Sequence, residues 1–73
     1  MKIKNDEVIK ALGRRVRELR TSQNLSQEQL ANEADVPLSQ IGRIERGEVN
    51  ITISSIYAIA NALGKTLIEF FNY

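Results

Sequence analysis

The chain contains no cysteine and no histidine, and this absence limits the ways in which so short a chain can be stabilised. Small domains often depend on disulfides or a structural metal ion, because a chain near this size buries only about 60% of its unfolded surface. With 73 residues, we expect one domain, residues 1–73, held together by an apolar core and without a metal site. Thiol redox chemistry and cysteine–histidine catalysis are excluded by the same absence.

The formal net charge of +1 conceals an uneven distribution. Residues 1–24 hold seven basic and three acidic side chains, whereas residues 25–50 hold two basic and five acidic ones. This distribution permits a polyanionic partner but does not by itself indicate nucleic acid. No apolar run approaches the roughly 18 residues of a membrane span, and the start, MKIKNDEV, lacks the apolar stretch of a signal peptide. We therefore expect a cytoplasmic protein that does not enter a membrane.

Apolar residues recur at helical spacing along the chain, and no repeat or linker interrupts them. The first helix is expected to begin near Asn5 or Asp6, both good N-cap residues, and to end in the segment TSQN. Its apolar stripe is predicted to consist of Val8, Leu12, Val16 and Leu19. Its arginines are expected to face solvent: Arg14, Arg15 and Arg17.

Four further short helices are indicated by their start and stop signals. Ser26 with Gln29, and Thr66 with Glu69, have the spacing of a capping box, and Thr52 can cap a helix between them. Pro37 favours a new helix, because proline suits a first turn. Gly47 and Gly64 supply stops. The pattern predicts an all-α fold of five helices without strands.

A helical wheel divides the third predicted helix into two faces. Ile41, Ile44 and Glu45 fall inward, so that Glu45 should not lack a partner. Leu38 falls on the shoulder, and the outward face consists of Ser39, Gly42, Arg43 and Arg46. Glycine in a helix interior costs about 1 kcal/mol relative to alanine. Two explanations for Gly42 stay open: close approach of another molecule, or close packing by another part of this protein.

The stretch from Gln27 to Glu45 resembles the helix-turn-helix of the phage-repressor-like family of bacterial DNA-binding proteins. The resemblance extends over residues 8–71 and includes the apolar or small positions Leu30, Ala31, Val36, Ile41 and Ile44. It implies a compact, five-helix, lambda-repressor-like DNA-binding domain. The helix-turn-helix unit would span residues 26–46, at helices two and three, with C-terminal helices over residues 53–71. Asp35 replaces the glycine usual in the family's turn, and aspartate tolerates the left-handed conformation.

In this family a recognition helix lies in the major groove of DNA, and the resemblance implies roles by position. The expected base contacts are Pro37, Leu38, Ser39, Gly42 and Arg43. The expected phosphate contacts are Gln27, Arg46, Asn50 and Arg20. Arginine can bind guanine O6 and N7 in a bidentate way, which suits Arg43. The resemblance also implies a structural ion pair between Arg20 and Glu45.

A homodimer is expected, because one recognition helix reads too few base pairs for selectivity and relatives place two on half-sites about 34 Å apart. On a wheel, the apolar arc of the fourth helix is wider than a surface helix needs. The surplus apolar surface suggests interface positions at Tyr57, Phe71 and Tyr73. Leu67 and Phe70 are expected to complete the core.

We therefore expect a sequence-specific transcriptional regulator, a repressor that binds double-stranded DNA at an inverted repeat. The shortness of the chain and the segment NITISSI are similar to restriction–modification controller proteins. An alternative is an antitoxin that neutralises a toxin and regulates its own operon, and the acidic middle segment suits such a partner. A protein-interaction module without DNA binding is a third possibility. An enzyme is not expected, because the carboxylates are scattered, and no cofactor or small-molecule ligand is evident.

Overall fold

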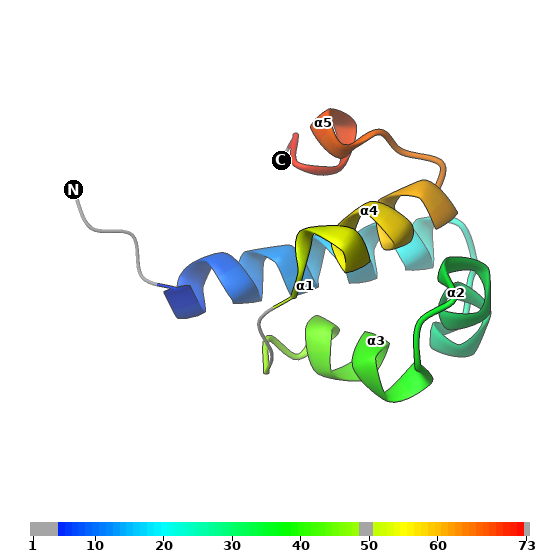
Figure 1. Cartoon of the computed structure of the whole chain (residues 1–73), viewed down its shortest axis with the longest axis horizontal. Helices are drawn as coiled ribbons and strands as arrows, with labels where there is room; N and C mark the ends of the chain where they lie inside the picture. The colour runs from blue at the N-terminus through cyan, green and yellow to red at the C-terminus, as the bar shows by residue number, and fades with distance from the viewer. Residues whose placement is uncertain (1–4, 49–50, 73) are drawn as a thin grey trace.

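The computed structural model describes residues 5–48 and 51–72, which form five helices and no strand. The helices are α1 (Asn5–Ser22), α2 (Gln27–Ala34), α3 (Leu38–Glu45), α4 (Ile53–Ala62) and α5 (Leu67–Phe70). In Figure 1, α3 lies at the lower edge and α5 at the upper edge, with α4 and the longer α1 between them. The predicted all-α architecture is confirmed. In the described part of the chain, every helix is too short or too polar to cross a membrane.

The starts of α2, α4 and α5 follow the side-chain caps that the sequence predicts, whereas α3 begins after Pro37 without a side-chain cap. The Ser26 hydroxyl accepts from the Gln29 amide at 3.0 Å, and the Ser26 amide donates to Gln29 Oε1 at 2.8 Å. Thr66 and Glu69 form the same reciprocal pair at α5. The Thr52 hydroxyl accepts from the Ser55 amide at the start of α4. Each cap satisfies backbone N–H groups that have no partner within the helix.

The turns between the helices depend on left-handed residues. Asp35 has φ 57° and ψ 47° at the end of α2, so aspartate does adopt the turn conformation for which the family uses glycine. Gly47 and Gly64 have φ of 71° and 73° and end α3 and α4 as predicted. Asn24, with φ 58°, serves the α1–α2 turn and was not singled out from the sequence.

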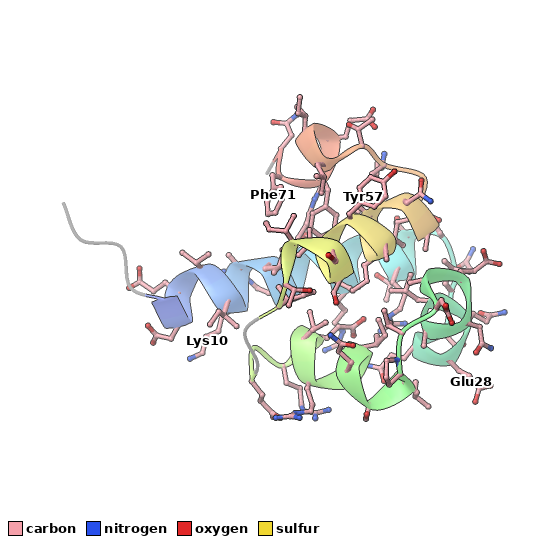
Figure 2. The ribbon with its side chains drawn as sticks, viewed as in Figure 1. Lys10, Glu28, Tyr57 and Phe71 are labelled. Carbon is pink, nitrogen blue, oxygen red and sulfur yellow. The ribbon has the colours of Figure 1, made fainter. Side chains whose placement is uncertain are left out.

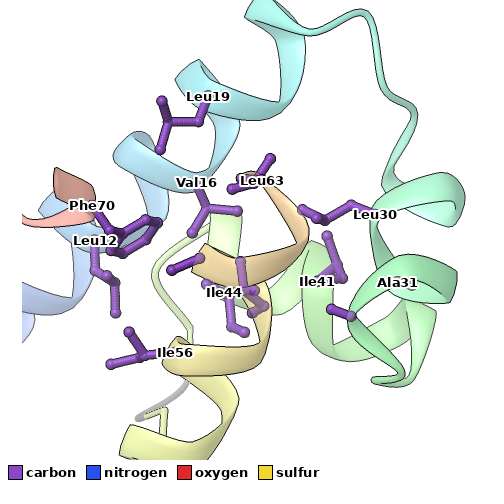
Figure 3. Close-up of a cluster of buried hydrophobic side chains, with 13 residues drawn as sticks. Leu12, Val16, Leu19, Leu30, Ala31, Ile41, Ile44, Ile56, Leu63 and Phe70 are labelled. Atoms are coloured by element: carbon purple, nitrogen blue, oxygen red, sulfur yellow. The ribbon is translucent and has the colours of Figure 1, made fainter. Parts of the chain in front are cut away.

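The core lies where α1, α2, α3 and α4 meet, and α5 closes one side of it (Figure 3). Val16, Leu30, Ile41, Ile59 and Phe70 are completely inaccessible to solvent. Full burial of such a side chain stabilises the folded state by about 1.5–3 kcal/mol. Phe70 is the largest of them and anchors the four-residue α5, whose partly buried Leu67 packs against the same core.

Two expectations for α1 are wrong. Val8 does not belong to the buried stripe and is 51% exposed, because the first turns of α1 extend beyond the other helices (Figure 1). Arg15 does not simply face solvent: its Nε and Nη2 donate to the carbonyls of Phe70 and Glu69 at 2.8 and 2.9 Å. These carbonyls belong to the last turn of α5, where helix carbonyls lack internal partners. Arg15 therefore fastens α5 to α1.

Candidate nucleic-acid interface

The helix-turn-helix unit is formed by α2, the turn at Asp35 and α3. The Asp35 and Val36 amides both donate back to α2, the latter to the Ala31 carbonyl at 3.0 Å. Ala31 is 3% exposed and faces the core beside α3. Its small side chain suits the crossing of two short helices. The turn and the small residue together hold α3 at one angle against α2.

A buried polar network connects α1, α2 and α3. Glu45 accepts from Arg20 Nε at 2.7 Å and from Arg20 Nη2 at 3.0 Å. The side chains are 12% exposed for Arg20 and 3% exposed for Glu45. The side-chain amide of Gln27 donates to the Glu45 carboxylate at 3.0 Å. Arg20 Nη1 donates to the Leu25 carbonyl at 2.8 Å. The hydrogen bond from Arg20 to Glu45 raises the pKa of Arg20, so the guanidinium stays charged.

This network contains the ion pair that the sequence predicts, and it engages two residues expected to contact phosphates. Arg20 donates from Nε, Nη1 and Nη2 within the protein, which is a structural role. Gln27 likewise supports Glu45 from the first residue of α2. Phosphate contacts from Arg20 and Gln27 stay predictions, and one from Arg20 would have to use its remaining Nη hydrogens and leave the Nε bond to Glu45 in place.

Gly13 permits the close crossing of α1 and α3, a role that the sequence reasoning missed. A Cβ atom at position 13 would lie 2.2 Å from the Ile44 carbonyl oxygen and 3.0 Å from that of Glu45. No real Cβ atom tolerates the shorter distance, so this crossing requires glycine. The available signal was a glycine inside an amphipathic helix, where glycine is unfavourable without a packing reason.

The outward face of α3 is exposed at three of the residues expected to contact bases. Ser39 and Arg43 are exposed, and Leu38 is 46% exposed. Pro37, which immediately precedes the helix, is also exposed. These side chains offer an apolar surface, a hydroxyl and a cation, which are the group types that read base edges in a major groove.

Gly42 is the exception, because it is buried rather than part of an open surface. A Cβ atom there would lie 3.1 Å from Arg46 Nη1 and 3.7 Å from Gln27 Oε1. Gly42 therefore has no open surface in this structure, and its expected base contact stays a prediction. The helical wheel predicted the direction of residue 42 correctly, but the long side chains of Arg46 and Gln27 cover this glycine. Of the two explanations for Gly42, close packing within the protein is the one that the structure supports.

Arg46 forms a second ion pair, with Glu48, at the end of α3. Arg46 Nε donates to Glu48 Oε2 at 2.8 Å, and Arg46 Nη2 donates to Glu48 Oε1 at 3.2 Å. The side chains are 58% and 51% exposed. Hydrogen bonding to Glu48 raises the pKa of Arg46, and the same bond lowers the pKa of Glu48.

The expected interface residues of the C-terminal helices are exposed where they are described. Tyr57 is 59% and Phe71 is 46% exposed, and both lie on the side of α4 and α5 away from α3 (Figure 2). A groove of about 520 Å³ adjoins Tyr57. Its other lining residues are Asn61, Gly64, Lys65, Thr66, Leu67 and Ile68. Asn50 and Tyr73 lie outside the described residues. No group of potential metal ligands occurs in residues 5–48 and 51–72.

Comparison with known proteins agrees with this geometry. Residues 16–70 match the helix-turn-helix family. The control protein C.BamHI of Bacillus amyloliquefaciens is 44% identical over 62 residues, which cover 80% of this chain and 76% of that protein. The control protein C.SmaI of Serratia marcescens is 38% identical over 61 residues, covering 84% of this chain and 73% of that protein.

A solved structure agrees over a similar length. The restriction-modification controller protein C.AhdI from Aeromonas hydrophila superposes with a TM-score of 0.85 at 38% identity, covering 89% of this chain and 98% of that chain. The members of this family are DNA-binding regulators and not enzymes, as expected from the scattered carboxylates. The chain belongs to the helix-turn-helix family of DNA-binding transcriptional regulators.

Proposed function

We propose that this regulator is a repressor that binds an inverted-repeat operator as a homodimer. The observation that carries the proposal is the exposed surface of Leu38, Ser39 and Arg43 on a helix anchored by a buried ion pair. An exposed reading face needs a fixed orientation, because its contacts with bases tolerate little displacement. The Glu45 carboxylate supplies that orientation by connecting α3 to α1 and α2.

We assign base reading chiefly to Arg43, whose guanidinium can bind guanine O6 and N7. Such a pair contributes about 1–3 kcal/mol of discrimination against another base. Ser39 adds a hydroxyl, and Pro37 with Leu38 can contact a thymine methyl group. Phosphate contacts are assigned to Arg46, Gln27 and Asn50, and backbone N–H groups at the start of α2 face the same strand.

Dimerisation through α4 and α5 is supported by apolar surface that a monomer leaves in water. The exposed fractions are 70% for Ile53, 59% for Tyr57, 85% for Ile68 and 46% for Phe71. Exposed apolar groups that gather on one side commonly mark an interface. We expect Tyr57→Lys to give monomers in analytical ultracentrifugation with an unchanged circular dichroism spectrum, because the side chain contributes to the interface and not to the core.

The regulated genes are proposed from the relatives. C.BamHI and C.SmaI are control proteins, and C.AhdI is a restriction-modification controller protein. These similarities support control of a restriction–modification operon in the cytoplasm over the antitoxin role. Endonuclease and methyltransferase genes beside the gene for this chain are the expected context, whereas a neighbouring toxin gene would favour the antitoxin role.

The direct test is selection of bound sequences from a random pool of duplex DNA, followed by affinity measurements on single-base variants. We expect a palindromic consensus. Arg43→Ala should weaken the preference at one base pair in each half-site by about 1–3 kcal/mol. Arg17→Ala, which removes an exposed arginine of α1, is the matched control and should keep every base preference. If Arg43→Ala retains the full preference at all positions, the assignment of base reading is wrong.

A further inference from the structure

A carboxylate lies at the C-terminal end of the cationic surface of α3. Glu48 lies just beyond the helix, and its amide donates to the Arg43 carbonyl at 2.9 Å. Its side chain binds Arg46, and the charge of Arg43 also contributes to lowering the pKa of Glu48. The carboxylate is therefore ionised at neutral pH, where it is paired with Arg46 and influenced by the charge of Arg43.

The geometry of the Arg46–Glu48 pair is that of an arginine–phosphate contact. Two nitrogens of one guanidinium edge, Nε and Nη2, donate to the two carboxylate oxygens of Glu48. Phosphate oxygens are recognised by arginine through the same parallel pair of hydrogen bonds. One guanidinium edge cannot hold both acceptors, so a phosphate that took this edge would have to displace Glu48.

Gly42 keeps the guanidinium close to α3. Arg46 Nη1 lies 3.1 Å from the position that a Cβ atom of residue 42 would occupy, so the end of this exposed side chain stays close to α3. The Nε–Nη2 edge is directed to Glu48, and both partners are more than half exposed. The edge that binds Glu48 is thus accessible to DNA from solvent.

We propose that Glu48 is an intramolecular competitor for DNA phosphate, which occupies the binding edge of Arg46 until a duplex displaces it. This inference rests on the phosphate contact assigned to Arg46 under the proposed function. A competitor of this kind weakens binding to any duplex by the same factor. Because non-specific binding consists almost entirely of phosphate contacts, Glu48 limits the time that the regulator spends on unrelated DNA.

The test compares the parent protein with Glu48→Gln, which keeps the size of the side chain and removes its charge. Affinity is measured on a selected operator duplex and on a random-sequence duplex over a range of salt concentrations. We expect Glu48→Gln to tighten binding to both duplexes by about threefold to tenfold, as for loss of a water-screened charge contact. The slope of log affinity against log salt should steepen by less than about 0.9, the value for a whole phosphate contact, because the parent protein also makes the Arg46 contact once Glu48 is displaced.

The specificity of the effect is tested by a double-mutant cycle with Arg46→Ala. Without Arg46, Glu48→Gln should change affinity by less than about twofold, because the competed edge is gone. The control Glu33→Gln removes an equal charge from the exposed surface of α2 and should have a comparably small effect.

Three results would overturn the inference: no gain from Glu48→Gln, an equal gain without Arg46, or parental affinity for Arg46→Ala. None of these results bears on the proposed function, which the loss of base preference in Arg43→Ala tests separately.

Discussion

The Arg20–Glu45 pair and the Arg46–Glu48 pair have nearly the same geometry, with shortest nitrogen–oxygen distances of 2.7 and 2.8 Å. Their surroundings differ. The side chains of the first pair are 12% and 3% exposed, whereas those of the second are 58% and 51% exposed. Glu45 also accepts from Gln27, so its pair joins three helices. Arg46 and Glu48 are two residues apart, and among the described residues their side-chain pair connects no second helix.

This difference assigns the two pairs to different tasks. A buried charge that loses its partner is strongly destabilising, so Arg20 and Glu45 have to stay paired while the domain is folded. An exposed pair contributes little to stability and can exchange partners readily. The same chemistry therefore holds α3 in place through one pair and, in the other, leaves exposed the cation that we propose as a phosphate contact.

The largest effect is expected from breaking the buried pair. Glu45→Ala leaves the Arg20 guanidinium without its charge partner and removes the acceptor of the Gln27 amide. The free energy of unfolding should fall by about 3 kcal/mol, measured by urea denaturation. Glu48→Ala is the matched control and should leave the unfolding midpoint unchanged, because its pair is exposed.

A small domain has only about 0.05–0.15 kcal/mol of stability per residue. The Glu45→Ala variant can therefore be too unstable to give a complete unfolding curve. In that case Glu45→Gln is measured instead, because glutamine keeps the size of the side chain and can still accept one hydrogen bond. An unfolding midpoint that moves equally for the substitutions at positions 45 and 48 would contradict the distinction between the pairs.

A smaller loss is expected when the crossing that aligns the buried pair is forced apart. Gly13→Ala places a Cβ atom 2.2 Å from the Ile44 carbonyl oxygen, so α1 and α3 must separate. Overpacking of this kind costs about 1–3 kcal/mol, partly offset by about 1 kcal/mol of alanine helix propensity. We expect a net loss of up to about 2 kcal/mol in thermal or urea unfolding. Unchanged or increased stability would show that the helices can separate without penalty.

The smallest effect, of opposite sign, is expected beside the exposed pair. Gly42→Ala meets only the ends of two flexible side chains, at 3.1 Å for Arg46 Nη1 and 3.7 Å for Gln27 Oε1. The free energy of unfolding should rise by up to about 1 kcal/mol from helix propensity. DNA affinity should nevertheless fall, because the methyl group displaces Arg46. A destabilised protein with parental DNA affinity would contradict this prediction.

The features that could be predicted from the sequence are local ones. The capping pairs at Ser26 and Thr66, and the left-handed turn at Asp35, depend on residues within a few positions of one another. Core positions followed from apolar spacing, and a charged residue next to the core, Glu45, required a partner. Its identity, Arg20, came from the family resemblance.

The features that could not be predicted depend on how distant segments meet. Arg15 binds carbonyls 54 and 55 residues away, and Gly13 is required only because α3 crosses α1 at that point. A helical wheel gives the direction of a side chain but not what folds over it, which is why Gly42 was placed on an open face. Val8 was placed in the core because the wheel ignores where the neighbouring helices end.

Titration of the ¹⁵N-labelled protein with its selected operator duplex, followed through the arginine Nε–Hε resonances, tests the central claim most directly. The two ion pairs and the reading residue are observed in one spectrum. We expect the Arg43 and Arg46 resonances to shift on DNA binding and the Arg20 resonance to keep its position. Movement of Arg20, or unchanged resonances for Arg43 and Arg46 in a bound complex, would contradict it.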